Sequence, residues 1–221
     1  MNILEPKGRF ATVNDFHYGL LSRNSEGTLP HHYLCGWSSA ESQQSRFAAL
    51  LRAVSFQGGS VVDYGCGTGD LFPYLAKQGY PFRYLGLDMN REMIRVAQQS
   101  CVGEFRLIVA DQVDFTTVDY VFASGIFQFV DNSEPQYYYR LVQALFAKCR
   151  SGIAANFLSA LRDDSEKHAD ELYLRPQNVV DMASSISGRW ALDHSYHPGR
   201  GDMTVGILAA TDATQWKRPK L

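Results

Sequence analysis

Apolar positions alternate between two patterns along the middle of the chain. Short apolar runs with β-branched residues predict buried strands, and apolar residues recurring every three or four positions predict amphipathic helices. Strands are expected at Val61–Tyr64, Arg83–Leu87, Glu104–Val109, Val118–Ala123 and Ile153–Leu158. Helices are expected between them at Asp70–Gln78, Arg91–Ser100 and Pro135–Arg150. Repeated strand–helix units of this length predict a parallel sheet with helices on both faces.

The segments on either side follow other patterns. Before the alternation, Val13–Leu21 predicts a short helix, and Ser38 with Glu41 has the spacing of a capping box that would open a second one. We expect this region to be a helical layer or a lid over a ligand site. After it, we expect a helix at Asn178–Ser187. Two strand-like segments then follow, separated by a short run of turn residues that predicts an antiparallel hairpin: Trp190–Tyr196 and Met203–Ala210.

Composition narrows the classes of function. The chain has 221 residues and a formal net charge of −2, so its charge does not favour a nucleic-acid-binding or anionic-membrane-binding surface. Its four cysteines form no Cys-x-x-Cys pair, which indicates reduced thiols rather than a zinc site or a disulfide scaffold. No stretch approaches the roughly 18 apolar residues of a membrane span. We therefore expect a cytoplasmic protein.

The segment Val61–Asp70 carries the first chemical signal. Its strand is followed by glycines at 65, 67 and 69, which suit a tight loop that a ligand can approach closely. The third glycine of a dinucleotide loop is out of place, and the Lys-Ser or Lys-Thr of a phosphate-binding P-loop is absent. Asp63 and Asp70 flank the loop and would repel a pyrophosphate. They favour a cationic ligand instead.

Acidic residues also end the next two strands. Asp88 is placed to accept hydrogen bonds from both hydroxyls of a ribose. Asp111 could accept from the exocyclic amine of adenine, and Gln112 could bind the same edge through its amide. Met89 contributes to an apolar wall for a flat base. Together these residues indicate an adenosine with a positively charged, phosphate-free tail.

Four segments resemble the motifs of class I S-adenosylmethionine-dependent methyltransferases, in the family's order and spacing. Val-Val-Asp-Tyr-Gly-Cys-Gly-Thr-Gly-Asp is similar to the first motif, and Tyr-Leu-Gly-Leu-Asp-Met-Asn to the ribose-binding second. Val-Ala-Asp-Gln resembles the adenine-binding third, and 119–124 the fourth strand. The resemblance covers about residues 55–160. It implies S-adenosyl-L-methionine as the cofactor.

The resemblance also implies a fold. We predict a doubly wound, mostly parallel, seven-stranded α/β sheet of the Rossmann-like methyltransferase type, with an antiparallel C-terminal hairpin strand and an N-terminal helical lid. We expect one domain over 1–221, divided into a lid segment (1–58), a cofactor-binding core (59–160) and a C-terminal helix and hairpin (161–221).

Carried over residue by residue, the resemblance places part of the chain at the cofactor. Asp63 and the glycine loop are expected near its methionine part, and Ser124 beside its sulfonium. Arg46 meets the cofactor carboxylate or forms a surface salt bridge, and both alternatives stay open. The expected cofactor-binding residues are Arg46, Asp63, Gly65, Cys66, Gly67, Asp88, Met89, Asp111, Gln112 and Ser124.

The methyl acceptor is less well indicated. It should enter over the carboxyl ends of the strands, where the loop Gly125–Val130 is the best candidate for its floor. The Asn/Asp-Pro-Pro-Tyr/Phe of members that methylate nucleobase or Gln amino groups is absent there. No catalytic residue is assigned, because the methyl donor is already activated and positioning can carry much of the catalysis. No metal is expected. The candidate acceptor residues are Trp37, Phe127, Gln128 and His197.

Three functions are compatible with these features. The favoured one is methyl transfer to a small-molecule metabolite or natural product by in-line displacement. An RNA or protein methyltransferase is the alternative, although it would usually bring a basic face or an added recognition domain. The third is a cofactor-binding protein without transferase activity. No membrane partner is expected, a nucleic acid is an unlikely one, and the pattern gives no oligomeric state.

Overall fold

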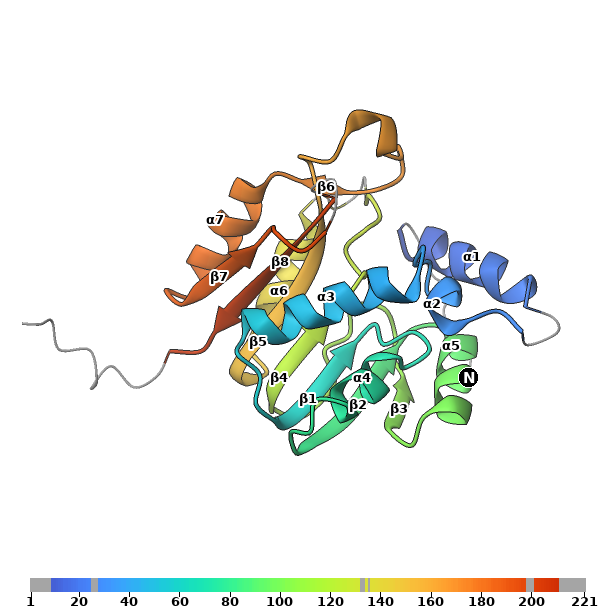
Figure 1. Cartoon of the computed structure of the whole chain (residues 1–221). Coiled ribbons are helices and arrows are strands. Elements are labelled where there is room, and N and C mark those ends of the chain that lie inside the picture. Colours follow the sequence, from blue (N-terminus) through green and yellow to red (C-terminus); the bar gives the residue numbers. More distant parts are fainter. Residues whose placement is uncertain (1–8, 25–27, 132–133, 135, 198–200, 211–221) are drawn as a thin grey trace, which may run out of the picture.

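A mixed sheet of eight strands forms the centre of the described chain, shown by a computed structural model in Figure 1. The structure describes residues 9–24, 28–131, 134, 136–197 and 201–210. The strands are β1 (Gly59–Tyr64), β2 (Phe82–Asp88), β3 (Glu104–Leu107), β4 (Val118–Ala123), β5 (Cys149–Ser159), β6 (Tyr173–Leu174), β7 (Trp190–Asp193) and β8 (Asp202–Leu208). Their order is β3-β2-β1-β4-β5-β8-β7, with β6 beside β5.

Helices cover both faces of this sheet, and two further helices from the N-terminal part of the chain lie near the ends of its strands. They are α1 (Arg9–Ser22), α2 (His31–Leu34), α3 (Ala40–Ala53), α4 (Leu71–Ala76), α5 (Arg91–Ser100), α6 (Tyr137–Phe146) and α7 (Pro176–Ile186), with a 3₁₀ turn at Asp164–Glu166. None of the described helices is both long and apolar enough to cross a membrane.

The strand pairings confirm the predicted architecture. The first five strands pair in parallel, and β8 lies antiparallel between β5 and β7. Neighbouring residues of β1 face opposite sides, because side chains alternate along a strand. Val61 packs in a core with α3, α4 and α5, whereas Val62 packs in a core with α6 and α7. The sheet is therefore buried on both faces and doubly wound.

Several boundaries differ from the predicted ones. The sheet gains an eighth strand because the short β6 pairs with the end of β5. β5 begins at Cys149 rather than Ile153, because Cys149 pairs with Val118 at the start of β4. The helix before it ends at Phe146, and Pro135 lies outside the described residues. Ser39, not Ser38, caps α3 by accepting a hydrogen bond from the Ser42 N–H at 3.1 Å.

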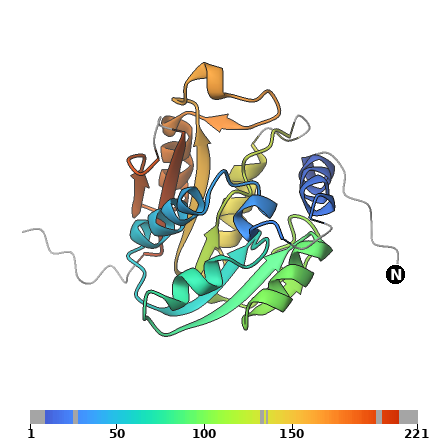
Figure 2. The ribbon, with the colours of Figure 1, turned by 45° about the vertical axis from the view of Figure 1, so that its right-hand side comes forward.

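The first two helices, α1 and α2, lie apart from the helix layers on the two faces of the sheet. Figures 1 and 2 show α1 beside α2, near the ends of the parallel strands. Phe16 fixes α1 from one side: its ring lies 5.7 Å from the ring of Phe129, in the segment after β4. It also covers Gly36, where an added Cβ would come within 2.9 Å of that ring. The N-terminal helices therefore contact the segment after β4, and this end of the sheet holds the candidate site.

Gly206 makes the packing of β8 against α3 sensitive to one methyl group. A Cβ at this position would lie 2.1 Å from the backbone oxygen of Ala53 at the end of α3. We expect Gly206→Ala to lower the free energy of unfolding by about 1–3 kcal/mol, the usual effect of overpacking. Gly188→Ala is the matched control, because no atom lies within 4 Å of its added Cβ. Urea denaturation measures both, and equal stability of the two variants would contradict this packing.

Candidate functional site

A pocket opens at the carboxyl ends of β1, β2 and β4, beneath the N-terminal helices. It encloses about 1070 Å³ of space, counting the part open to solvent at its mouth. The sheet side of its wall comes from the predicted cofactor motifs: Asp63, Gly65, Cys66, Gly67, Asp88, Met89, Asp111 and Ser124. The other side comes from the N-terminal segment: Val13, His17, Cys35, Trp37, Gln43 and Phe47.

The glycine loop after β1 uses its backbone donors internally. The N–H groups of Gly65 and Cys66 both donate to the Leu87 carbonyl at the end of β2, at 2.7 and 3.0 Å. The Gly67 N–H donates to the Asp88 carboxylate at 2.8 Å, and the Gly69 N–H to the Cys66 carbonyl at 2.9 Å. A phosphate-binding loop instead directs such donors at its anion. This loop is therefore not built to hold a phosphate.

Steric limits explain the glycines themselves. Gly65, Gly67 and Gly69 all have positive φ angles, which side chains rarely adopt. A Cβ on Gly65 would lie 2.1 Å from the side chain of Ile126, in the segment after β4. One on Gly67 would lie 2.8 Å from Cys35 Sγ. The loop therefore packs closely against the segment after β4 on one side and against the N-terminal segment on the other.

Asp88 organises this region through its carboxylate. One oxygen accepts from the Gly67 N–H and the other from the Asn90 N–H, both at 2.8 Å. A carboxylate offers about four lone-pair positions, more than these backbone donors occupy, so it can still accept from a hydroxyl of a ligand. Burial raises its pKa, against the lowering effect of the Asn90, Gly67 and Met89 backbone N–H groups and of the His17 charge. The geometry is compatible with the ribose diol predicted from sequence.

Asp63 is a buried carboxylate with a neutral partner. The Tyr84 hydroxyl donates to it at 2.6 Å, and both side chains are almost inaccessible to solvent. Burial raises the pKa of Asp63 to about 7, and the nearby charges of Asp88 and Asp70 act in the same direction. A positive group in the pocket would favour its ionised form. A buried carboxylate near two other carboxylates, with only a neutral hydroxyl as its partner, fits a cationic ligand and disfavours an anionic one.

The two residues predicted to bind adenine, Asp111 and Gln112, differ in their position relative to the pocket. Asp111 lies in the pocket wall with φ at +60°, a conformation that Asp tolerates better than most residues. Its carboxylate accepts from Arg140 of α6 at 2.9 Å. Gln112 is exposed and does not line the pocket, while its backbone carbonyl accepts a bond from Tyr64. The structure therefore places Asp111, but not the Gln112 side chain, in the pocket wall.

Asp70 connects the glycine loop to the N-terminal segment. Its carboxylate contacts His31 of α2 at 3.1 Å, Gln43 of α3 at 2.9 Å and Thr68 of the loop at 3.0 Å. Burial acts to raise the pKa of Asp70, but these hydrogen bonds and the His31 charge bring it below its ordinary value. Cys35 Sγ adds a contact to Thr68 at 3.1 Å. The side chain predicted to repel phosphate thus joins the N-terminal segment to the glycine loop.

A second, much smaller cavity lies beside Trp37; its space counted in the same way is about 230 Å³, including the part open to solvent, and it has room for about one water molecule. Trp37 and Gly125 line both cavities, so the two cavities adjoin each other at these residues. A Cβ on Gly125 would come within 2.8 Å of the indole, so the glycine permits this close approach. The remaining lining residues are Arg46, Phe127, Gln128, Asn156, Phe157, Leu158 and Asp202. This cavity brings together three predicted acceptor residues: Trp37, Phe127 and Gln128.

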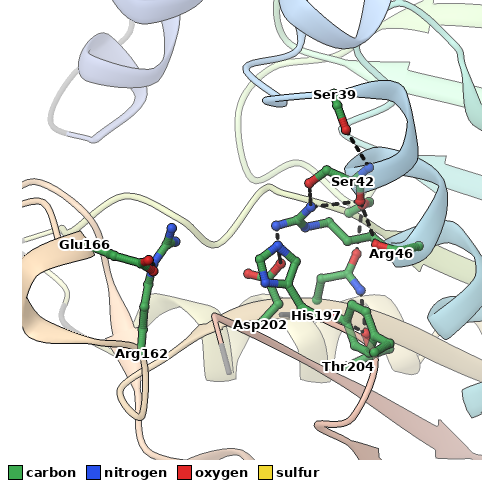
Figure 3. Close-up of polar contacts among 12 residues, drawn as sticks. Ser39, Ser42, Arg46, Arg162, Glu166, His197, Asp202 and Thr204 are labelled. Atoms are coloured by element: carbon green, nitrogen blue, oxygen red, sulfur yellow. Dashed lines mark hydrogen bonds and ion pairs between the residues drawn. The ribbon is translucent and has the colours of Figure 1, made fainter. Parts of the chain in front are cut away.

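Arg46 and Asp202 form a buried ion pair at the wall of the second cavity (Figure 3). Arg46 also donates to the Ser42 carbonyl at 2.8 Å, and its guanidinium lies 4.4 Å from the centre of the Trp37 ring. Arg46 is therefore neither on the surface nor in the wall of the larger pocket. His197, the fourth predicted acceptor residue, lies 3.8 Å from Asp202 without lining either cavity.

A chain of hydrogen bonds runs inward from Ser124. Its hydroxyl donates to Asn156 at 2.8 Å, and Asn156 donates to Thr204 at 2.6 Å. Thr204 in turn donates to the Tyr196 hydroxyl at 2.9 Å. Burial raises the pKa of Tyr196, and the charge of Asp202 adds to the increase. These bonds fix the side chain of Ser124 between the two cavities.

Sequence reasoning missed His17 as a pocket residue. It lies on α1 and lines the larger pocket, whereas His197, the histidine predicted from sequence, lies beside Asp202. A histidine on a short predicted helix gives no local sign that it faces a pocket. Within the described residues, no group of three or more His, Cys, Asp or Glu side chains is arranged to hold a metal ion.

Comparisons with known proteins agree with the geometry. A family model described as a methyltransferase domain matches residues 61–148. The putative methyltransferase Rv1506c of Mycobacterium tuberculosis (strain ATCC 25618 / H37Rv) is 32% identical over 159 residues, which span 69% of this chain and 94% of that protein.

Solved structures share the fold at lower identity. Magnesium protoporphyrin IX methyltransferase from Synechocystis PCC 6803, solved with bound SAH, matches with a TM-score of 0.59 at 13% identity, over 89% of this chain and 95% of its own. A chain in the complex of the Haloferax volcanii Trm112 methyltransferase activator with the putative methyltransferase matches with a TM-score of 0.62 at 15% identity, over 88% and 97%.

The His31–Asp70 contact predicts a pH-dependent stability. The hydrogen bond to Asp70 raises the pKa of His31, against the effect of burial. The protonated form therefore stabilises the fold below the unfolded-state pKa of about 6.5, and this contribution disappears as pH rises through the higher folded value. His31→Asn removes the charge but keeps a donor near the Nδ1 position. We expect its loss of Tm to be largest near pH 6 and to shrink toward pH 9.

The same measurement in an Asp70→Asn background provides the control. Without the Asp70 charge, His31→Asn should change Tm equally at both pH values. A pH-independent Tm difference in the parent protein would show that His31 is not held as an ion pair.

Proposed function

Because the chain belongs to the class I S-adenosylmethionine-dependent methyltransferase family, we propose that it transfers the methyl group to a small-molecule acceptor held next to Trp37. The larger pocket would hold the cofactor and the smaller cavity would receive part of the acceptor. The observation that carries this proposal is that Trp37 and Gly125 form the common wall of both cavities. Donor and acceptor would then meet at Ser124 and Gly125.

The cofactor supplies a methyl group already activated on a sulfonium. Asp88 would accept from the ribose hydroxyls, and Asp111 from the adenine amine. Asp63, buried against Tyr84, would balance positive charge at the methionine end. The N-terminal segment, fastened to the loop through Asp70, would exclude water from the pocket. Positioning and desolvation are the contributions that such a displacement requires.

The smaller cavity has room for only a small group of an acceptor. Its walls combine the aromatic rings of Phe127 and Phe157 with the polar ends of Gln128 and Asn156. Apolar walls with a few placed polar groups are typical of small-molecule sites. The formal net charge of −2 gives no support to an RNA acceptor. The Synechocystis relative is named for a small-molecule acceptor, magnesium protoporphyrin IX, but that likeness concerns the fold alone.

We assign Arg46 to the acceptor cavity. The sequence predicted that it would meet the cofactor carboxylate, but it does not line the larger pocket, and its ion pair with Asp202 lies at the wall of the smaller cavity. Its stacking on Trp37 supports this role, because the guanidinium fixes the ring that lines both cavities.

A labelling experiment tests the class of acceptor. The protein is incubated with cofactor carrying an isotopically labelled methyl group, together with a small-molecule collection, total RNA or a protein extract. We expect label in a small molecule, with formation of the demethylated cofactor. Label confined to RNA or protein would contradict the small-molecule proposal while leaving the methyltransferase activity intact. Asp88→Ala is the control, since labelling that depends on the cofactor pocket should fall with this substitution.

Asp63 predicts how cofactor affinity depends on pH. Its pKa of about 7 means that half of the protein carries a protonated Asp63 near neutrality. A cationic cofactor group beside it favours the ionised form, so binding should release a proton. We expect the Kd to be flat above pH 8 and to rise roughly tenfold between pH 8 and pH 6. Isothermal titration calorimetry measures this dependence. Asp63→Asn should remove it, and an unchanged Kd from pH 8 to pH 6 would place the positive end elsewhere.

A further inference from the structure

His17 brings a side chain of the lid into the wall of the cofactor pocket. It lies on α1, and its ring is part of the wall that also contains Asp88 and Met89. Its neighbour Phe16 fixes α1 against Phe129 and Gly36. The position of the His17 ring therefore follows from the packing of its own helix.

The hydrogen bond on one side of the ring determines its tautomer. Nδ1 lies 3.2 Å from the carbonyl oxygen of Leu34, the last residue of α2. A carbonyl only accepts, so Nδ1 carries the hydrogen and donates it. The donor also satisfies a carbonyl at the end of a helix, where no intrahelical partner exists. In the neutral ring the other nitrogen, Nε2, then has a free lone pair and acts as an acceptor.

The environment keeps this ring neutral. Burial lowers the pKa of His17, and the charge of Asp88 and the Leu34 hydrogen bond oppose this effect without reversing it. Both His17 and Asp88 line the same pocket. The wall of this pocket therefore contains two residues with acceptors, the Asp88 carboxylate and the Nε2 of His17, which hydrogen-bond donors of a ligand can satisfy.

We propose that His17 Nε2 accepts a hydrogen bond from a ribose hydroxyl of the cofactor, alongside Asp88. A vicinal diol has two O–H donors, and this pair of acceptors matches them. The inference rests on the proposed placement of the ribose at Asp88. It adds a consequence for the lid: α1 is linked to the rest of the site through the cofactor itself. Cofactor binding therefore orders α1 over the pocket.

Binding of S-adenosylhomocysteine to matched variants tests this bond. His17→Asn keeps a donor near Nδ1 for Leu34 but has no acceptor at the Nε2 position, whereas His17→Gln places a polar group near Nε2. We expect His17→Asn to raise the Kd about threefold to tenfold, the effect of one neutral hydrogen bond, and His17→Gln to raise it less. Tyr18→Phe, on the exposed side of the same helix, should leave the Kd unchanged.

Ribose analogues separate a direct contact from a packing effect. The 2′-deoxy and 3′-deoxy forms of S-adenosylhomocysteine each lack one donor. If His17 accepts from a hydroxyl, removing that hydroxyl should weaken binding to the parent protein more than to His17→Asn, by the same threefold to tenfold factor. If both analogues lose affinity equally in the parent and in His17→Asn, the proposed bond does not exist.

Asp88→Ala distinguishes this failure from a failure of the proposed cofactor placement. Unchanged affinity in Asp88→Ala would mean that the ribose lies elsewhere, and both proposals would fall. Weakened affinity in Asp88→Ala, with unaltered analogue discrimination in His17→Asn, would overturn the His17 bond alone. Hydrogen exchange gives a second measurement: the cofactor should protect amides of α1 in the parent protein and protect them less in His17→Asn.

Discussion

The hydrogen bonds between the glycine loop and the end of β2 determine what this site can bind. Leu87 accepts two loop N–H groups and Asp88 accepts a third, so the loop donors face the sheet rather than the pocket. The same bonds hold Asp88 at the pocket wall with lone pairs still available. A loop whose sequence could suggest phosphate binding thereby becomes one wall of a pocket rich in acceptors. The ligand must bring donors and positive charge.

The N-terminal segment depends on that loop in turn. Asp70 receives His31, Gln43 and Thr68, so one carboxylate joins α2, α3 and the loop. Cys35 lies so close to Gly67 that any side chain at that position would displace it. The N-terminal segment is therefore held to the loop by close packing at Gly67 as well as by the hydrogen bonds of Asp70. A change in the loop geometry would reach the N-terminal helices directly.

The sequence was sufficient for the fold because the fold is encoded in repeating local patterns. Alternating strands and helices predicted both core faces, and the limits of α5 and β4 agree with the expected ones. The errors lie where tertiary pairing decides. β5 extends to Cys149 because β4 offers a partner there, and β6 exists only through its pairing with β5. Neither extension has a pattern of its own in the sequence.

The candidate site was predictable in part for the same reason. Asp63, Asp88 and Asp111 follow strands, so the rule that parallel strands end at one edge brings them together. Gln112 adjoins Asp111 in sequence, but it faces outward because the turn at Asp111 has a positive φ angle. His17 and the Arg46–Asp202 pair depend on contacts between segments far apart in the chain. The residues that contact these side chains could not be inferred from the spacing of residues along the sequence.

Charge balance explains why these separate parts belong to one site. Asp70 is paired with His31, and Asp88 is stabilised by two backbone N–H groups, but Asp63 receives the neutral hydroxyl of Tyr84. The three carboxylates also interact, since the charges of Asp88 and Asp70 raise the pKa of Asp63. Asp63 is thus the carboxylate whose charge is least balanced by its partners, and this part of the pocket favours a positive group. A sulfonium cofactor loses one positive charge when its methyl group leaves, so in the proposed placement the attraction between these carboxylates and the cofactor would weaken in the product.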